Sequence, residues 1–233
     1  MFLRYWLKSG FINAIAGAFI FFSFIFFGYA EYFDRIFIVF LVVVGLFNIK
    51  NVNVISIIVI LMIERLLEEV FYFSTTFQLA KVIIYTLSII FVYYFWYDLL
   101  VKRLILPLLI VVFIAEIYWN LIGYNPPRIH FYIEMIWLNI ITRYLLFMRI
   151  PVVKKIFSPK ASQTSLDWQL YSLAKWNVII IGLLVVEYLF RHLTALNPLF
   201  LYHYYKYIIQ LLSFLTLFFI TKHLINYKFK VIM

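Results

Sequence analysis

Residues 113–143 read FIAEIYWNLIGYNPPRIHFYIEMIWLNIITR, and this stretch decides the fold class. Two apolar runs flank an Asn-Pro-Pro turn that begins at Asn125, and each run carries one carboxylate, Glu116 before the turn and Glu134 after it. Because the two acids lie a similar number of residues from the turn, an antiparallel helical hairpin would place them at a similar depth. The stretch therefore predicts a transmembrane hairpin with two acids in a costly environment.

The composition of the whole chain indicates a membrane protein. Hydrophobic residues make up 67% of the 233 residues, charged residues make up 13%, and the mean hydropathy is +1.02. A soluble domain is typically about half apolar and about a quarter charged. Segments such as IFIVFLVVVGLF, residues 36–47, do not alternate apolar and polar residues as the strands of a membrane β-barrel do. We predict an all-α, polytopic integral membrane helical bundle that forms a single transmembrane domain.

Apolar segments recur along the chain and predict about eight transmembrane helices, arranged as four antiparallel hairpins. They cover approximately residues 11–30, 36–49, 54–73, 77–97, 104–122, 129–147, 171–190 and 199–220. The first segment follows Arg4 and Lys8, as the apolar part of a signal peptide would. It is longer than the roughly 7–15 residues of such a region, so we expect a retained span.

The longest polar interval, 149–170, is predicted to be an inner-side loop that contains an interfacial helix. Pro151 and Pro159 are expected to limit helix continuity there. Thr164 and Asp167 have the spacing of a capping box, so a helix is expected to begin at this point and to lead into the seventh span.

Basic residues are distributed unequally between the two predicted sides of the membrane. One side would hold Arg4, Lys8, Lys50, Lys102, Arg103, Arg149, Lys154, Lys155, Lys160, Lys222, Lys228 and Lys230, and the other only Arg35, Arg128 and Arg191. An excess of Lys and Arg marks the cytoplasmic side, so both termini are predicted to be cytoplasmic, or on the matrix side in an organelle. Residues with AT-rich codons dominate, which fits an AT-rich bacterial genome, a horizontally acquired locus or an organelle genome. The predicted location is a bacterial inner membrane, or an organelle inner membrane if the protein is organelle-encoded. The net charge of +10 is assigned to these loops and not to a nucleic-acid partner.

Several charged side chains within the apolar segments are candidates for structural ion pairs. They are Glu64, Arg65, Glu68, Lys81, Glu187 and Lys206. In the third span Arg65 precedes Glu68 by three residues, so the helix can pair its own charges, and Lys81 lies at comparable depth beyond the next turn. A carboxylate ion site is the alternative for the acids of this span. In the last hairpin Glu187 and Lys206 lie at similar distances from the turn, which predicts an interhelical ion pair.

Glu116, Glu134 and Arg143 are the candidates for an ion or proton site. The two acids have no opposite charge nearby in their own hairpin, and two close carboxylates in a low dielectric can hold a proton between them or bind a cation. The competing interpretation is that each faces the headgroups or a basic group elsewhere, for example Lys81 or Lys206. Arg143 lies on the other side of its helix from Glu134, so its expected partner is a neighbouring subunit or a lipid phosphate.

No catalytic or cofactor signature accompanies these charges. The chain has no Cys, no phosphate-binding Gly loop and no Ser-His-Asp set, and His192 and His203 lack an obvious third metal ligand. We expect no cofactor, no metal and a non-catalytic or accessory subunit of a larger membrane complex, which lines a proton or ion path. Its expected partners are the lipid bilayer and other membrane subunits or copies of itself. The alternatives are a small secondary transporter or channel that uses the intramembrane carboxylates, and a lipid-modifying intramembrane enzyme.

Overall fold

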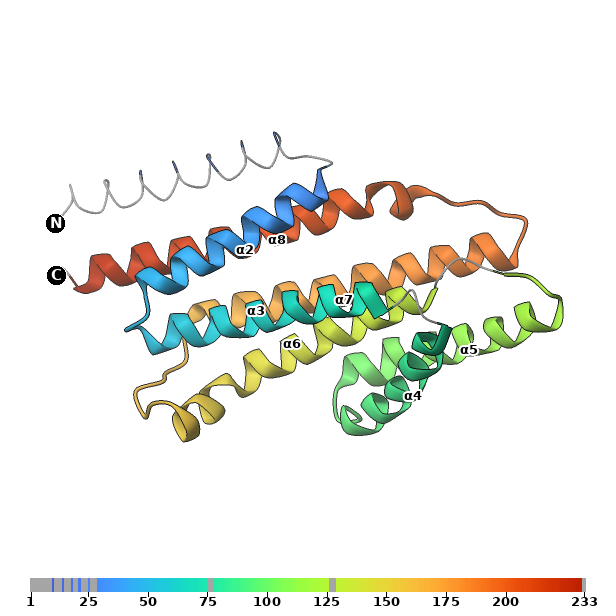
Figure 1. Cartoon of the computed structure of the whole chain (residues 1–233), viewed down its shortest axis with the longest axis horizontal. Helices are drawn as coiled ribbons and strands as arrows, with labels where there is room; N and C mark the ends of the chain where they lie inside the picture. The colour runs from blue at the N-terminus through green and yellow to red at the C-terminus, as the bar shows by residue number, and fades with distance from the viewer. Residues whose placement is uncertain are drawn as a thin grey trace. The chain divides into compact units, whose positions relative to one another are not determined.

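The computed structural model describes residues 29–74, 78–125 and 129–231, together with five isolated positions before residue 29. The described residues form seven α-helices and one π-helix, with no strand among them. The helices are α2 (Ala30–Phe47), α3 (Val52–Ser74), α4 (Gln78–Tyr94), the π-helix η1 (Val101–Ile105), α5 (Leu106–Leu121), α6 (Ile129–Ile156), α7 (Ser165–Leu193) and α8 (Phe200–Val231) (Figure 1). The all-α prediction is confirmed for this part of the chain.

Four helical segments among the described residues are long and apolar enough to cross a membrane. They are Val101–Leu121, Ile129–Ile156, Ser165–Leu193 and Phe200–Tyr227, and the apolar helix Ala80–Tyr94 is shorter. The predicted class, a helical membrane protein, is therefore confirmed. The first predicted span, 11–30, lies largely outside the described residues. The count of eight spans and the four-hairpin arrangement stay predictions.

The π-helix before α5 follows from the position of Pro107. Proline has no N–H, so Pro107 cannot close the α-helical hydrogen bond to the carbonyl of Arg103. The preceding turn is wider, and the Leu106 amide donates to the Val101 carbonyl, five residues back. The fifth predicted span, 104–122, is thus observed as a π-helix that leads directly into an α-helix.

The predicted interruption at Pro151 is wrong, because α6 continues through this residue to Ile156. Proline costs a helix one backbone hydrogen bond and some bending, and Leu146 and Val153 bury apolar surface on either side of it. The connection from α6 to α7 is therefore short, residues 157–164, and not the whole interval 149–170. α7 begins at Ser165, as the capping-box spacing predicts, and the Thr164 amide donates to the Asp167 carboxylate at 2.8 Å.

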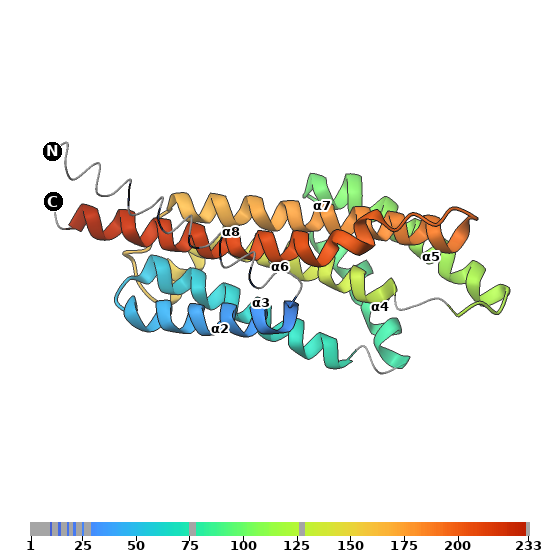
Figure 2. The same ribbon diagram turned by 90° about the horizontal axis from the view of Figure 1, so that it is seen from above.

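The chain divides by its internal contacts into two compact units. Unit 1 contains Met1–Met62, Tyr144–Leu173 and Lys206–Met233, and unit 2 contains Ile63–Arg143 and Ala174–Tyr205. In unit 1, α2 and the first part of α3 run antiparallel and side by side (Figures 1 and 2). The core of this unit is apolar and joins five helices through Phe33, Phe37, Leu41, Ile57, Leu61, Leu146, Leu166, Leu170, Phe214 and Leu217.

Unit 2 combines apolar packing with polar contacts between helices. α4 and α5 form a hairpin (Figure 1), and Trp137 of α6 packs against Phe91 of α4 and against Phe95, which directly follows α4. The Trp137 Nε1–H donates to Ser88 Oγ at 2.8 Å, so the buried indole is also anchored to α4 through a hydrogen bond. Polar links of this kind hold helices together where lipid supplies no hydrophobic force between them.

Candidate functional site

Glu116 on α5 forms an ion pair with Lys81 on α4, within unit 2. The Tyr85 hydroxyl, one turn further along α4, donates to the other carboxylate oxygen of Glu116 at 3.2 Å. Glu116 is 6% exposed, so its charge is compensated inside the unit by a cation and a phenol. The structure therefore places Glu116 opposite Lys81, the competing interpretation from the sequence, and not opposite Glu134. The sequence-based interpretation had also paired Lys81 with the acids of the third span, but in the structure its ion pair is with Glu116.

Glu134 on α6 is in a different situation. It is 5% exposed, and both of its carboxylate oxygens are buried without a hydrogen-bond partner. Its neighbours one turn away on the same helix are His130, also buried, and Trp137. An ionised carboxylate in such surroundings would cost several kcal/mol, so the group is expected to carry a proton or to bind a cation.

Arg143, the third candidate, pairs inside unit 2. Its guanidinium donates to Asp98 Oδ2 at 2.7 Å, and Asp98 Oδ1 accepts the Leu100 amide at 2.9 Å. Asp98 thus caps the helical segment that begins after the α4–α5 turn and neutralises Arg143. The sequence-based expectation of a neighbouring subunit or a lipid phosphate as the partner is corrected by this intrachain pair.

The remaining ion-pair candidates lie on α3, α7 and α8. Arg65 and Glu68 form the predicted pair at 2.6 Å, and Glu64 lies close enough to feel the charge of Arg65. Glu187 on α7 accepts the backbone amides of Leu201 and Tyr202, at 2.7 and 2.8 Å.

These two amides belong to the first turn of α8, where backbone donors have no partner inside the helix. Glu187 therefore caps α8 and complements its dipole. The Lys206 ammonium lies 4.9 Å from the centre of the Tyr207 ring. Both members of the predicted Glu187–Lys206 ion pair thus have other partners.

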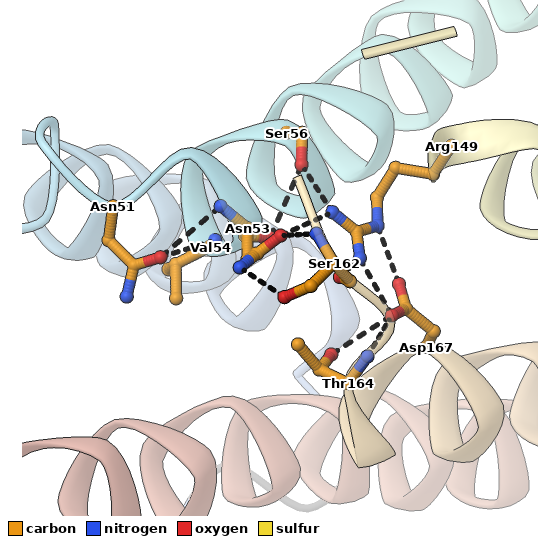
Figure 3. Close-up of polar contacts among 8 residues, drawn as sticks. All are labelled: Asn51, Asn53, Val54, Ser56, Arg149, Ser162, Thr164 and Asp167. Atoms are coloured by element: carbon orange, nitrogen blue, oxygen red, sulfur yellow. Dashed lines mark hydrogen bonds and ion pairs between the residues drawn. The ribbon is translucent and has the colours of Figure 1, made fainter. Parts of the chain in front are cut away.

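A buried polar network in unit 1 was not predicted from the sequence. Arg149 on α6 is 1% exposed and makes a two-pronged ion pair with Asp167 on α7, at 2.6 and 2.7 Å (Figure 3). The same guanidinium donates to Ser56 Oγ on α3 at 2.9 Å and to the Ser162 carbonyl at 2.8 Å. Asp167 keeps its contact with Thr164, so this carboxylate both caps α7 and holds the arginine.

Asn53, near the start of α3, completes this Arg149 network. Its Oδ1 accepts the Ser162 amide at 2.8 Å, and its Nδ2 donates to Ser162 Oγ at 3.1 Å (Figure 3). Asn51 caps α3 by accepting the amides of Asn53 and Val54. The network thus joins the starts of α3 and α7 to α6 and fixes the connection between α6 and α7. Such a satisfied network is structural in character.

An aromatic cluster surrounds His192 in unit 2. The imidazole Nδ1 is 2.8 Å from the Tyr124 hydroxyl, and the centres of the imidazole and Tyr188 rings are 4.2 Å apart. The Trp119 indole donates to the His192 backbone carbonyl at 3.3 Å. Arg191 lies 4.8 Å from the centre of the Tyr202 ring. No three His, Cys, Asp or Glu side chains of the described residues lie together as metal ligands would.

Glu134 therefore stands apart from the other buried charged side chains. Glu116, Arg143, Arg149 and Asp167 have charged partners, and Glu187 has two backbone amides. In the described part of the chain, Glu134 is the buried acid whose oxygens accept no hydrogen bond. Comparison with known protein families, with curated proteins and with solved structures gives no match.

Proposed function

We propose that the protein is an accessory, non-catalytic subunit of a larger membrane complex and that it contributes a proton-binding carboxyl group, Glu134, to a proton or ion path. The observation that supports this proposal is the burial of both Glu134 oxygens without a partner. Ionisable groups inside transmembrane helices are expensive, and those that persist commonly serve proton or ion pathways. Glu116 does not share this role, because its carboxylate oxygens already have partners in Lys81 and Tyr85.

A carbodiimide provides a direct test, because it modifies protonated carboxyl groups in apolar surroundings. Native membranes that contain the tagged protein would be treated with the carbodiimide at neutral pH. The mass of the purified chain would then be measured by mass spectrometry. The expected result is one adduct, absent from Glu134→Gln and retained in the matched variant Glu116→Gln. An adduct that survives Glu134→Gln would refute the assignment of the proton to this residue.

The subunit role is tested separately by purification in mild detergent and by reconstitution. We expect other membrane proteins to copurify with the tagged chain, and we expect vesicles that contain the chain alone to show no proton flux with an entrapped pH-sensitive dye. Purification of the chain by itself from its native membrane would contradict the subunit role.

The second candidate is a small secondary transporter or channel that works alone. It is favoured by the intrachain pairs Lys81–Glu116, Asp98–Arg143 and Arg149–Asp167, because a chain that neutralises its own charges needs no partner for that purpose. In this case the reconstituted chain would conduct protons, and Glu134→Gln would abolish the flux. For either candidate the proposed location is a bacterial inner membrane, or an organelle inner membrane, with the Lys- and Arg-rich loops inside.

A further inference from the structure

An apolar groove with a cavity volume of about 460 Å³ lies in unit 2, between α7 and the segment formed by η1 and α5. Its walls include Leu104 and Val111 on one side and Val186 and Phe190 on the other. Val111, Val186 and Phe190 are partly exposed, so the groove opens to the surroundings of the protein. In a membrane those surroundings are lipid chains.

Arg103 lines the same groove and is the charged residue of its lining. Its side chain is exposed and has no ion pair in the described part of the chain. The nearest acid in sequence, Asp98, is already occupied by Arg143 and by the Leu100 amide. The adjacent Lys102 does not line the groove, and its ammonium lies 5.1 Å from the centre of the Trp96 ring.

The residues just before Arg103 indicate the depth of its guanidinium in the membrane. Tyr93, Tyr94, Trp96 and Tyr97 are all exposed and follow one another around the α4–α5 turn. Exposed Trp and Tyr residues gather where the hydrocarbon meets the headgroups. We therefore expect the guanidinium at the level of the headgroup phosphates. The groove extends from it along apolar side chains.

We propose that this groove binds an anionic phospholipid, with one acyl chain along the apolar walls and the headgroup phosphate on Arg103. Guanidinium and phosphate form strong charge-assisted hydrogen bonds, and basic pockets between transmembrane helices on the inner side favour anionic headgroups. The lipid would supply the countercharge that Arg103 does not find among the described residues. The site is separate from Glu134 and does not depend on its proposed role.

Native mass spectrometry of the full chain in a non-ionic detergent tests this proposal. Phosphatidylglycerol and phosphatidylcholine with identical acyl chains would be added in equal amounts. We expect the anionic lipid to bind about fivefold better, the selectivity that one basic residue near a membrane surface provides. Arg103→Gln should reduce phosphatidylglycerol binding to the level of phosphatidylcholine, whereas Val186→Phe, which fills the groove, should reduce the binding of both lipids.

Two matched variants serve as controls. Lys102→Gln removes a neighbouring charge outside the groove lining, and Ile114→Phe enlarges an exposed side chain of α5 outside it, so both should retain selective binding. Equal binding of the two lipids to the unmodified protein would overturn the proposal, as would unchanged selectivity in Arg103→Gln. Competition by glycerol phosphate as effective as that by phosphatidylglycerol would also overturn it, since the site would then bind a free anion and no acyl chain.

Discussion

Buried ionisable side chains in the described part of this protein are found in three kinds of surroundings. Arg149 and Asp167 neutralise each other, Glu187 accepts backbone amides at a helix start, and Glu134 has neither kind of partner. The free-energy consequences differ, because removing one member of a buried pair leaves an uncompensated charge, whereas removing an isolated carboxyl does not. Substitutions at single positions can therefore distinguish these cases.

The isosteric variants Glu116→Gln and Glu134→Gln should have different effects on stability. Glu116→Gln leaves the Lys81 cation without its carboxylate, and because Lys81 is partly exposed we expect a loss of about 1–2 kcal/mol in the free energy of unfolding. With Glu134 protonated, as proposed, Glu134→Gln replaces one neutral, unpartnered group by another, so the change should be within about 0.5 kcal/mol. Unfolding by sodium dodecyl sulfate in mixed micelles at neutral pH measures both. A larger loss for Glu134→Gln would show that its carboxylate has a charged partner.

Arg149 should be the most sensitive of the buried basic residues. Arg149→Met leaves the Asp167 carboxylate buried without its cation and the Ser162 carbonyl without the guanidinium donor. We therefore expect a loss of about 3–5 kcal/mol in the free energy of unfolding. The double variant with Asp167→Asn should recover part of this loss, because it removes the uncompensated charge. Arg149→Lys should restore little, since an ammonium cannot reproduce the two-pronged contact. The same detergent titration applies, and full rescue by Lys would contradict this account.

Sequence separation explains which polar contacts were predictable. Arg65 with Glu68 and Thr164 with Asp167 are three residues apart, so helix geometry alone brings them together. Lys81 meets Glu116 across 35 residues, and Arg149 meets Ser56 across 93. Such pairs depend on which helix faces pack together, which no local pattern specifies. For Lys81 the sequence left the acids of the third span, Glu116 and Glu134 open as partners. For Arg149 it predicted only a basic residue on the inner side of the membrane.

At the scale of the element, glycine and proline positions decide how helices begin, bend and end. Gly123 follows α5 with φ of +68°, and the Tyr124 amide donates back to the Trp119 carbonyl, which closes the helix end. Gly182 lies inside α7 opposite Leu104, where an added Cβ would meet the Leu104 side chain at 3.5 Å, an ordinary contact. The backbone conformation thus favours glycine at position 123, whereas neither conformation nor space requires it at position 182.

Alanine at these two positions should change stability in opposite directions. Gly123→Ala forces a Cβ into the left-handed region, at an expected cost of about 1–2 kcal/mol in the free energy of unfolding. Gly182→Ala improves helix propensity without a clash and should stabilise the protein by about 0.5–1 kcal/mol. Paired thermal unfolding of the two variants in detergent checks the prediction. Destabilisation by Gly182→Ala would contradict the prediction and would mean that the Leu104 side chain of η1 leaves no room for a Cβ on α7.

At the scale of the whole molecule, composition and segment length were sufficient for the fold class. The spans predicted at 104–122, 129–147, 171–190 and 199–220 correspond to the four helices that are long and apolar enough to cross a membrane. The charges of α3 and the shortness of α4 keep these two helices outside that group. Their apolar pattern predicts membrane spans, but length and charge alone do not establish them, so the eight-span count needs a direct test.

The absence of Cys makes that test straightforward, because single cysteines can be introduced without background labelling. With eight spans, Lys50→Cys and Lys160→Cys should react only with a reagent that enters the cytoplasm, and Asn125→Cys and Leu196→Cys should react with an impermeant maleimide from outside. These positions lie in connections between helices, so labelling should not disturb the fold. An epitope at the N-terminus should be protected in intact cells. If the epitope is accessible while all four cysteines behave as predicted, the first segment does not cross the membrane and the count is seven.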